Sequence, residues 1–333
     1  MKDIRRELLN ELKEVAPQRN IKLATNIEYL KEDNNIWIVM KKEAIGYADK
    51  PNMQKDSEAF EGWAMIIKSH YQSDVVKKIV LDVDIDEMPS PKEVFSEVFV
   101  SDGIKRGHYG RFLYRALRFY EDYDWFELSP KIMKVVKEFE KILQENVCCN
   151  HLQKAEARTN NKKEKQVEAF FSENPQELIN LLGNVKEIRG NVYRQLLCWL
   201  RIKNNKIPLF TENMSALDLW NVTDNEMNIF ELKAANYSKI GIISELFFYV
   251  HYCKDVFSNS AVFEMKKSEG NERGYGILQC STVEKINGFM LANKYHPLVT
   301  NQVVEMLNIN HSGIKYYKAS EYEIGLYVKP IVM

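Results

Sequence analysis

The sequence lacks the features of several specialised protein classes. No apolar run approaches the roughly 20 residues that a membrane-spanning helix needs. The N-terminal MKDIRRELLNELKEV predicts a charged amphipathic helix and has no apolar core of the kind found in signal peptides. The five cysteines are scattered and include no C-x-x-C pair, which disfavours zinc-binding and disulfide-rich classes. These absences indicate a cytoplasmic protein without a membrane partner.

An excess of charge of one sign is also lacking. Lys and Arg number 46 against 47 Asp and Glu, so the formal net charge is −1. This balance excludes a wholly basic protein that coats DNA. Any binding of nucleic acid must therefore depend on local basic patches, or on metal ions that supply positive charge at the site.

The length of 333 residues predicts two domains. Segment 147–164 is polar, carries a Lys cluster and lacks apolar periodicity, which is typical of a linker. It would separate an N-terminal α/β recognition or regulatory domain of unknown fold (1–146) from a second α/β domain (165–333). We expect the two units to fold independently.

Apolar periodicity predicts alternating helices and strands in both domains. In the first domain, helices are predicted at 1–15, 110–123 and 130–146, and strands at 36–40, 64–68 and 79–84. In the second domain, helices are predicted at 165–172, 175–182, 191–203, 240–257 and 300–308, and strands at 207–210, 216–222, 228–234, 276–280 and 323–329.

The segment SALDLWNVTDNEMNIFELKAA predicts a β-hairpin that brings charged side chains together. A turn at Asp224-Asn225 is favoured because both residue types tolerate the positive φ of a type I′ turn. The resulting register places Asp218 opposite Glu231, with their Cβ atoms about 5 Å apart. Strand alternation puts Lys233 on the same face as Glu231.

Two facing carboxylates repel each other unless a proton or a cation lies between them. Mg²⁺ suits such a pair because it prefers oxygen ligands and binds through one or two carboxylates plus substrate phosphate. A neighbouring Lys can orient the attacking water and stabilise charge on the phosphate. The pattern is therefore typical of metal-assisted phosphodiester hydrolysis, although a surface hairpin with a Lys-bridged acidic pair is the structural alternative.

The hairpin resembles the PD-(D/E)xK nuclease superfamily, whose core is a helix, a three-strand meander, a helix and a further strand. The family's first acid corresponds to Asp218 in ALDLW, and its E-x-K corresponds to Glu231, Leu232 and Lys233 in IFELKA. Leu217 stands where the namesake proline would be. The resemblance covers about residues 165–300 and implies a restriction-endonuclease-like core in the C-terminal half.

This resemblance also implies roles for individual residues. Asp218 and Glu231 would hold Mg²⁺ or Mn²⁺, the carbonyl of Leu232 would be a further ligand, and Lys233 would position the water. In the long helix after the hairpin, Glu245 is a candidate accessory catalytic residue, or else a carboxylate paired with a Lys. DNA is favoured over RNA because the superfamily acts mostly on DNA.

The family's first helix often supplies another acid, but the source of that acid is open here. The predicted helix at 191–203 contains no carboxylate. Glu187 lies just before it, and Glu168 lies in the preceding predicted helix.

Two groups of basic residues are candidate contacts to the nucleic-acid backbone. The first group precedes the hairpin and includes Arg189, Arg194 and Arg201. Arg194 and Arg201 are seven residues apart, so they would share a helical face that either contacts phosphate or is merely solvated. The second group is Arg111, Arg115 and Arg118, whose i, i+4, i+7 spacing forms one stripe interleaved with aromatic residues. The stripe either contacts phosphate or is the charged face of a core helix.

We therefore expect a metal-dependent nuclease, most simply a DNA endonuclease with a role in defence or repair, and leave formation of a homodimer open. One alternative is a catalytically silent nucleic-acid-binding protein that keeps the nuclease fold. Another is a nucleotidyl transferase that uses Asp82 and Asp84 in VLDVDIDE. That motif is favoured as a solvent-facing edge strand, since no third acid in a convincing strand follows it.

Overall fold

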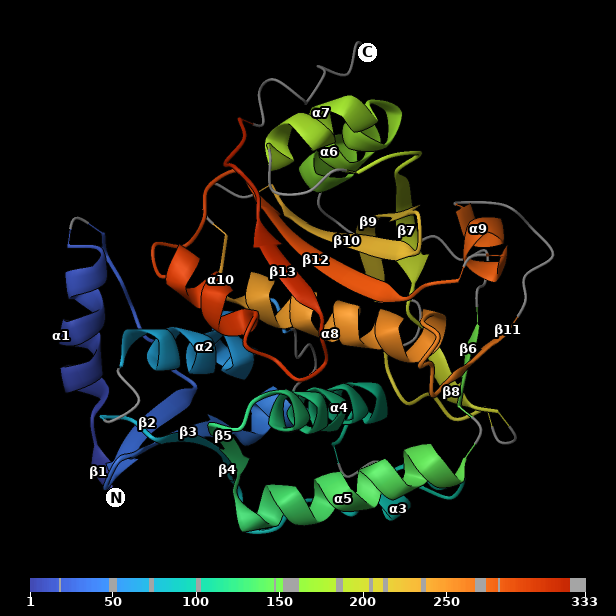
Figure 1. Cartoon of the computed structure of the whole chain (residues 1–333). Coiled ribbons are helices and arrows are strands. Elements are labelled where there is room, and N and C mark those ends of the chain that lie inside the picture. The colour runs from blue at the N-terminus through green and yellow to red at the C-terminus, as the bar shows by residue number, and fades with distance from the viewer. Residues whose placement is uncertain are drawn as a thin grey trace.

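The computed structural model contains two five-stranded mixed sheets and the helices packed around them (Figure 1). It describes residues 1–17, 19–47, 53–71, 75–99, 103–146, 148–151, 162–183, 188–203, 206–211, 215–234, 238–266, 274–280 and 282–323. Within these ranges, no helix has both the length and the apolar character needed to cross a bilayer. The α/β class predicted from the sequence is confirmed.

The first sheet has the strand order β1-β2-β3-β4-β5. Its strands are β1 (Lys2–Asp3), β2 (Ile27–Glu32), β3 (Asn35–Lys41), β4 (Lys78–Asp84) and β5 (Phe126–Leu128). Strands β1 to β3 pair antiparallel, whereas β4 and β5 pair parallel because helical crossovers precede them. The helices of this half are α1 (Arg5–Val15), α2 (Phe60–His70), α3 (Pro91–Val94), α4 (Arg106–Asp122) and α5 (Pro130–Glu145), with 3-10 turns at Lys42–Ile45 and Asp56–Glu58.

The second sheet has the strand order β13-β12-β10-β9-β7. Its strands are β7 (Tyr193–Leu197), β9 (Ala216–Thr223), β10 (Glu226–Lys233), β12 (Lys285–Ala292) and β13 (Lys315–Lys318). The first three form an antiparallel meander, and β10, β12 and β13 are mutually parallel. Helices α6 (Lys162–Glu173) and α7 (Pro175–Leu182) cover one face, and α8 (Gly241–Phe257) covers the other (Figure 1).

The remaining elements connect or flank the two sheets. They are a three-stranded sheet of β11 (Glu264–Lys266), β6 (Cys148–His151) and β8 (Leu200–Ile202), and helices α9 (Tyr275–Cys280) and α10 (Asn301–Leu307).

Helix α8 lies between the second sheet and helices α2 and α4 of the other half (Figure 1). All its residues except Lys254 are buried, as expected of a helix that packs on every side. Glycine allows this close approach, because a Cβ on Gly62 of α2 would lie 2.5 Å from the side chain of Ile240. The Gly62 N–H also donates to Ser244 Oγ at 3.4 Å.

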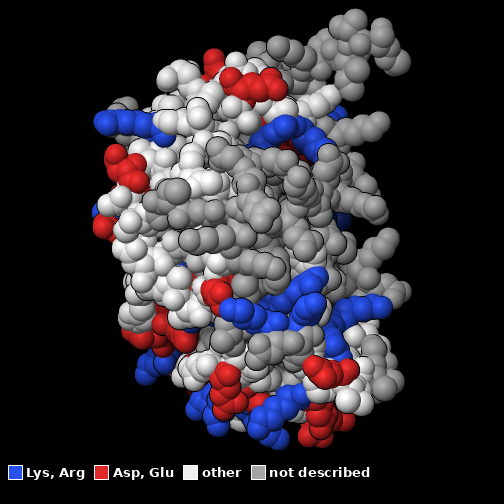
Figure 2. Space-filling model, turned by 90° about the vertical axis from the view of Figure 1, so that its right-hand side faces the viewer, with Lys and Arg blue, Asp and Glu red and all other residues white. Residues whose placement is uncertain are grey.

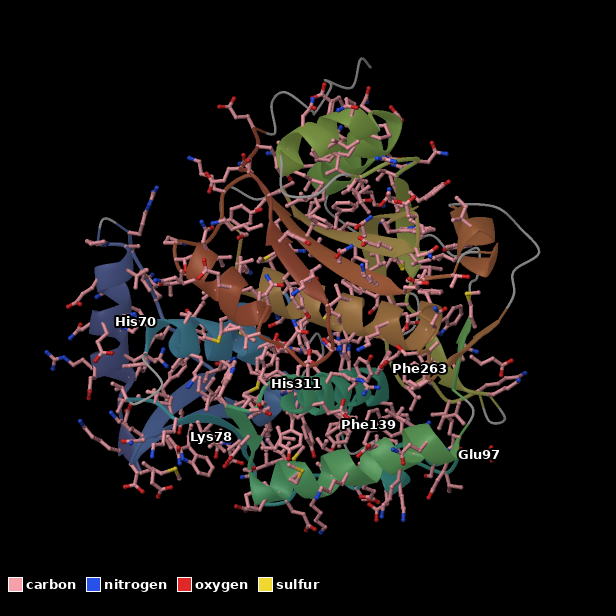
Figure 3. All side chains as sticks on the ribbon, viewed as in Figure 1. His70, Lys78, Glu97, Phe139, Phe263 and His311 are labelled. Atoms are coloured by element: carbon pink, nitrogen blue, oxygen red, sulfur yellow. The ribbon has the colours of Figure 1, made fainter. Side chains whose placement is uncertain are left out.

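The two halves share one hydrophobic core, which extends from Ile4 to Tyr316. Polar contacts tie the same interface: Tyr123 Oη donates to the Leu307 carbonyl at 2.9 Å. His311 lies beside α4 in Figure 3, and its Nε2 is 2.9 Å from Asp124 Oδ1. Independent folding of 1–146 and 165–333 stays a prediction, but separation of the halves would expose this common core to water.

The predicted linker 147–164 is in part structured. Residues 148–151 form β6, and 162–164 belong to α6. Residues 147 and 152–161 lie outside the described ranges, as do most residues of the strand predicted at 323–329.

Several predicted elements are wrong in type. The apolar run 64–68 belongs to helix α2, and 276–280 belongs to helix α9, because periodicity cannot separate strand from helix in a short apolar run. The predicted helix 191–203 consists of strands β7 and β8, and the predicted strand 207–210 makes only an isolated bridge at Pro208. Strand β4, which carries Asp82 and Asp84, lies between β3 and β5 and is no edge strand.

Candidate active site

The predicted hairpin forms with the predicted register. Strands β9 and β10 pair antiparallel from the turn to the pair of Leu219 with Phe230, so the next opposed positions are Asp218 and Glu231. The turn itself differs from the prediction. Within this turn only Asp224 has a positive φ, of 54°, so it is not a type I′ turn, which needs two such residues.

The hairpin brings three charged side chains to one patch, which α8 completes with a fourth. The Leu232 N–H donates to Asp218 Oδ2 at 2.8 Å across the two strands. Lys233 Nζ donates to Glu231 Oε1 at 2.5 Å and lies 2.6 Å from Glu245 Oε2. We call Asp218, Glu231, Lys233 and Glu245, together with Glu168 described next, the carboxylate patch.

Helix α6 adds Glu168, which the sequence pattern alone did not single out from Glu187. Gln195 Nε2 donates to Glu168 Oε2 at 2.7 Å. Gln195 lies on β7 at the position opposite Asp218, and its φ of 56° is a conformation that costs energy for a residue other than glycine. Glu187 lies outside the described residues.

Burial and crowding of carboxylates dominate the electrostatics of the patch. Burial raises the pKa of Glu168 to about 8, and the charge of Asp218 adds to this rise. Burial also raises the pKa of Asp218 to about 7, and Glu245 contributes. For the same reasons, the pKa of Glu231 lies well above its ordinary value. Burial alone would lower the pKa of Lys233, but Glu231 and Glu245 raise it well above its ordinary value.

The patch holds more carboxylates than its lysine can neutralise. Glu231 Oε2 and Glu168 Oε1 are buried oxygens that accept no hydrogen bond from the described part of the chain. Buried polar atoms normally have a partner, so these oxygens are candidate ligands for a cation. An all-oxygen donor set suits Mg²⁺ or Mn²⁺ better than zinc.

No group of three or more His, Cys, Asp or Glu side chains in the described ranges is already arranged to hold a metal ion. Lys233 Nζ lies between Glu231 and Glu245 and supplies the positive charge there. The donor chemistry therefore fits a divalent cation, but binding would require the side chains to rearrange around it.

The arginine stripe on α4 is mostly paired, with Arg111 and Arg115 buried and Arg118 half-buried, which contradicts an exposed phosphate-binding stripe. Arg115 is 3% exposed and forms a two-point ion pair with Glu61, in which Nε donates to Oε1 at 2.6 Å. Arg118 Nη2 lies 2.7 Å from Asp255 Oδ2 on α8. The alternative interpretation, a core helix with a charged face, describes these residues.

Arg111 differs from its two neighbours because it makes no ion pair with a carboxylate of the described residues. It is 7% exposed, and Nη2 is 3.1 Å from His108 Nδ1. Burial and Arg111 together lower the pKa of His108 to about 3, so the imidazole is neutral and can accept this bond. Burial lowers the pKa of Arg111 to about 10, against the opposing influence of Tyr249 and Glu245 on α8. Arg111 thus lies within electrostatic reach of the carboxylate patch.

The other predicted arginines do not share a helical face, since β7 and β8 replace the predicted helix. Arg194 is exposed on β7 and is close enough to Glu168 to lower its pKa. Arg201 lies on β8, half-buried, with Cζ 4.3 Å from the Trp199 ring centroid. Arg189 is exposed, and its backbone N–H donates to Thr223 Oγ1 at 3.0 Å.

The surface near the small sheet carries both signs of charge. In the lower part of Figure 2, Lys and Arg side chains lie directly beside Asp and Glu side chains. Where β8 and β11 lie, Lys203 Nζ is 2.6 Å from Glu264 Oε2. This mixing agrees with the absence of an overall basic charge.

The second acidic motif remains apart from the carboxylate patch. Asp82 is half-buried with Oδ1 3.4 Å from Lys131 Nζ, and Asp84 is exposed at the end of β4. No third acid in the described ranges joins them in a metal-binding group.

Comparison of this chain with protein-family models, with curated proteins and with solved structures gives no match.

Proposed function

We propose that this protein is a Mg²⁺- or Mn²⁺-dependent nuclease of the PD-(D/E)xK kind. The convergence of Asp218, Glu231 and Lys233 on adjacent strands is the observation that carries this proposal. The order of elements supports it, since α6, the meander β7-β9-β10, α8 and β12 follow the sequence of helix, three strands, helix and strand that the resemblance implies. The meander begins with β7, and α6 takes the place of the first helix.

The residues of the patch divide into cation-binding and charge-stabilising groups. Asp218 and Glu231 would hold the ion, Glu168 would join them from α6, and the carbonyl of Leu232 stays a predicted ligand. When bound, the ion would supply positive charge to the phosphate and lower the pKa of its bound water. Lys233 would orient the attacking water and stabilise negative charge on the phosphate oxygens. Glu245 would hold the Lys233 ammonium in place.

A DNA strand is the proposed substrate, because the superfamily that the hairpin resembles acts mostly on DNA. RNA is the less favoured substrate. Endonucleolytic cleavage, a role in defence or repair, and a cytoplasmic location stay predictions.

One observation favours a second candidate, a nucleic-acid-binding module without catalysis. Lys233 already neutralises part of the patch, and no three-ligand metal group is preassembled in the described ranges. Such a module would bind nucleic acid without metal and would cleave nothing.

The test uses the full chain with plasmid, linear duplex, single-stranded DNA and RNA, in Mg²⁺, in Mn²⁺ and in EDTA. We expect metal-dependent cleavage that Asp218→Asn and Glu231→Gln each reduce by about 100-fold or more. Asp224→Asn is the matched control, because it makes the same chemical change in the exposed turn of the same hairpin. Equal cleavage by all four proteins, or none by the wild type, would overturn the proposal.

A further inference from the structure

A pocket of about 690 Å³ opens at the carboxyl ends of β12 and β13. Most of its lining comes from the segment after β12, from Lys294 to Gln302, and from Lys318 at the end of β13. Arg19, which follows α1, reaches the same pocket from the N-terminal half. The pocket is thus built jointly by both halves of the chain.

The pocket adjoins the edge of the sheet where the carboxylate patch lies. Lys233 is the last residue of β10, and its Cα partner on β12 is Ala292. The Lys233 carbonyl accepts from the Asn293 N–H at 3.2 Å and from Tyr322 Oη at 3.2 Å. Lys294 and Glu321 of the pocket are the immediate chain neighbours of these two residues. Both sites therefore lie at the carboxyl ends of parallel strands, where α/β sheets commonly bind ligands.

The charges around the pocket favour an anion. Of the described residues that line the pocket, Arg19, Lys294 and Lys318 are basic and Glu321 is acidic. Glu321 Oε1 accepts the Tyr295 N–H at 3.0 Å. Lys318 is held in place by a 3.1 Å hydrogen bond from Nζ to the Val299 carbonyl, and it lies 5.0 Å from the centroid of the Tyr295 ring. Three basic side chains and one acidic side chain among the described lining residues make an environment suited to phosphate rather than to an apolar ligand.

We propose that this pocket binds backbone phosphates of the nucleic-acid strand that extends from the carboxylate patch. The inference rests on the proposed function, because it takes the substrate class from that function. It gives the N-terminal half a direct contact with the substrate through Arg19, in place of the arginine stripe on α4. The contact is electrostatic, so it contributes affinity without reading sequence.

Matched pairs of exposed cations make the test specific. The pocket variant is Arg19→Gln with Lys294→Gln, and the control is Lys285→Gln with Lys315→Gln. The control residues begin β12 and β13, so they lie at the opposite edge of the same sheet, and all four side chains are exposed. Both variants remove two positive charges. Affinity for duplex and single-stranded DNA is measured against salt in Asp218→Asn protein, which keeps the substrate intact.

We expect the pocket variant to bind DNA about tenfold more weakly and to lower the slope of log affinity against log salt by about 1 to 2 units, with the control unchanged. Equal losses in both variants, or none in either, would overturn the inference. Inorganic phosphate is titrated as a separate probe. If it binds the wild type and not the pocket variant while DNA affinity is unaffected, the pocket takes free phosphate and the polynucleotide assignment is wrong.

Failure of the inference is distinguishable from failure of the proposed function. Binding is measured in a protein that cannot cleave, so a pocket effect without wild-type cleavage would reject only the nuclease. Wild-type cleavage with unaltered binding by the pocket variant would reject only the pocket.

Discussion

The arginine helix α4 and the carboxylate patch both bury charged side chains, but they balance charge in opposite ways. On α4, Arg115 and Arg118 each have a carboxylate at ion-pair distance, Glu61 and Asp255. In the patch, four carboxylates accompany one lysine, and burial and crowding raise the pKa values of Glu168, Asp218 and Glu231. Pairwise balance is what a stable core requires, whereas an excess of one sign costs stability and is typical of a functional site.

The comparison predicts its largest effect at the balanced pair. Glu61→Gln leaves the guanidinium of Arg115 buried without a counter-charge, so the free energy of unfolding should fall by about 3–5 kcal/mol. Glu121→Gln is the control, because Glu121 pairs with Arg118 at 2.7 Å but is 39% exposed; its loss should change stability by about 1 kcal/mol or less. Urea denaturation measures both. Equal effects would show that burial does not separate the two kinds of pair.

The same kind of change in the patch should have the opposite effect on stability. Asp218→Asn removes one of several crowded carboxylates, so unfolding in EDTA should occur at the same urea concentration as in the wild type, or at a higher one. Cleavage should fall by about 100-fold or more, since a metal ligand is lost. If Asp218→Asn instead destabilises the protein, then Asp218 stabilises the fold, as Glu61 does beside α4.

Stability of the metal-free protein should decline as the pH rises from about 4 to about 8. Burial and neighbouring carboxylates raise the pKa of Asp218 to about 7 and of Glu168 to about 8, whereas both groups titrate near pH 4 in the unfolded chain. In this window the folded state retains protons that the unfolded state has released, so higher pH favours unfolding. Urea denaturation at pH 5 and pH 8 measures the decline.

Two further measurements assign that decline to the patch. Glu168→Gln should flatten it, and saturating Mg²⁺ should oppose it at pH 8 by binding the ionised carboxylates. A decline that persists unchanged in Glu168→Gln and in Asp218→Asn would mean that other groups cause it.

Arg111 offers an intermediate case, because it lies on the balanced helix but within reach of the patch. Arg111→Gln should reduce cleavage by about tenfold, because a buried positive charge within electrostatic reach of Glu245 is lost beside the patch. The matched control is Arg106→Gln at the start of the same helix, where Nη2 donates to the Ser96 carbonyl at 2.8 Å. Steady-state cleavage rates of both variants show whether Arg111 contributes to cleavage. Parallel losses in the two would make Arg111 a structural residue only.

The smallest effect is expected from the arginines on β7 and β8, Arg194 and Arg201. Arg194→Ala with Arg201→Ala should lower the slope of log affinity against log salt by about 1 to 2 units and leave cleavage of bound DNA unaltered. Arg194 should account for more of this change, because Arg201 is half-buried against Trp199. An unaltered slope would mean that these side chains are merely solvated.

The carboxylate patch was predictable where local pattern alone decides geometry. Side chains alternate in any strand, so Glu231 and Lys233 had to share a face, and a tight turn set the register that brings Asp218 to them. Glu245 was identifiable because an acid within the apolar stretch of a helix needs a partner. Glu168 was not identifiable, since its place depends on how α6 packs against the sheet.

The sequence by itself determined the hairpin, its register and the bounds of amphipathic helices such as Pro175–Leu182, because these depend on contacts between residues that are near in the chain. Only the tertiary structure decided that 64–68 is helical, since an apolar run buried on all sides carries no periodicity that separates helix from strand. It also decided that 193–197 is a strand, through its pairing with β9. The tertiary structure also decided that Arg115 and Arg118 on α4 form ion pairs with distant carboxylates. Their spacing is local, but their partners Glu61 and Asp255 lie far away in the chain, and only the shared core brings them together.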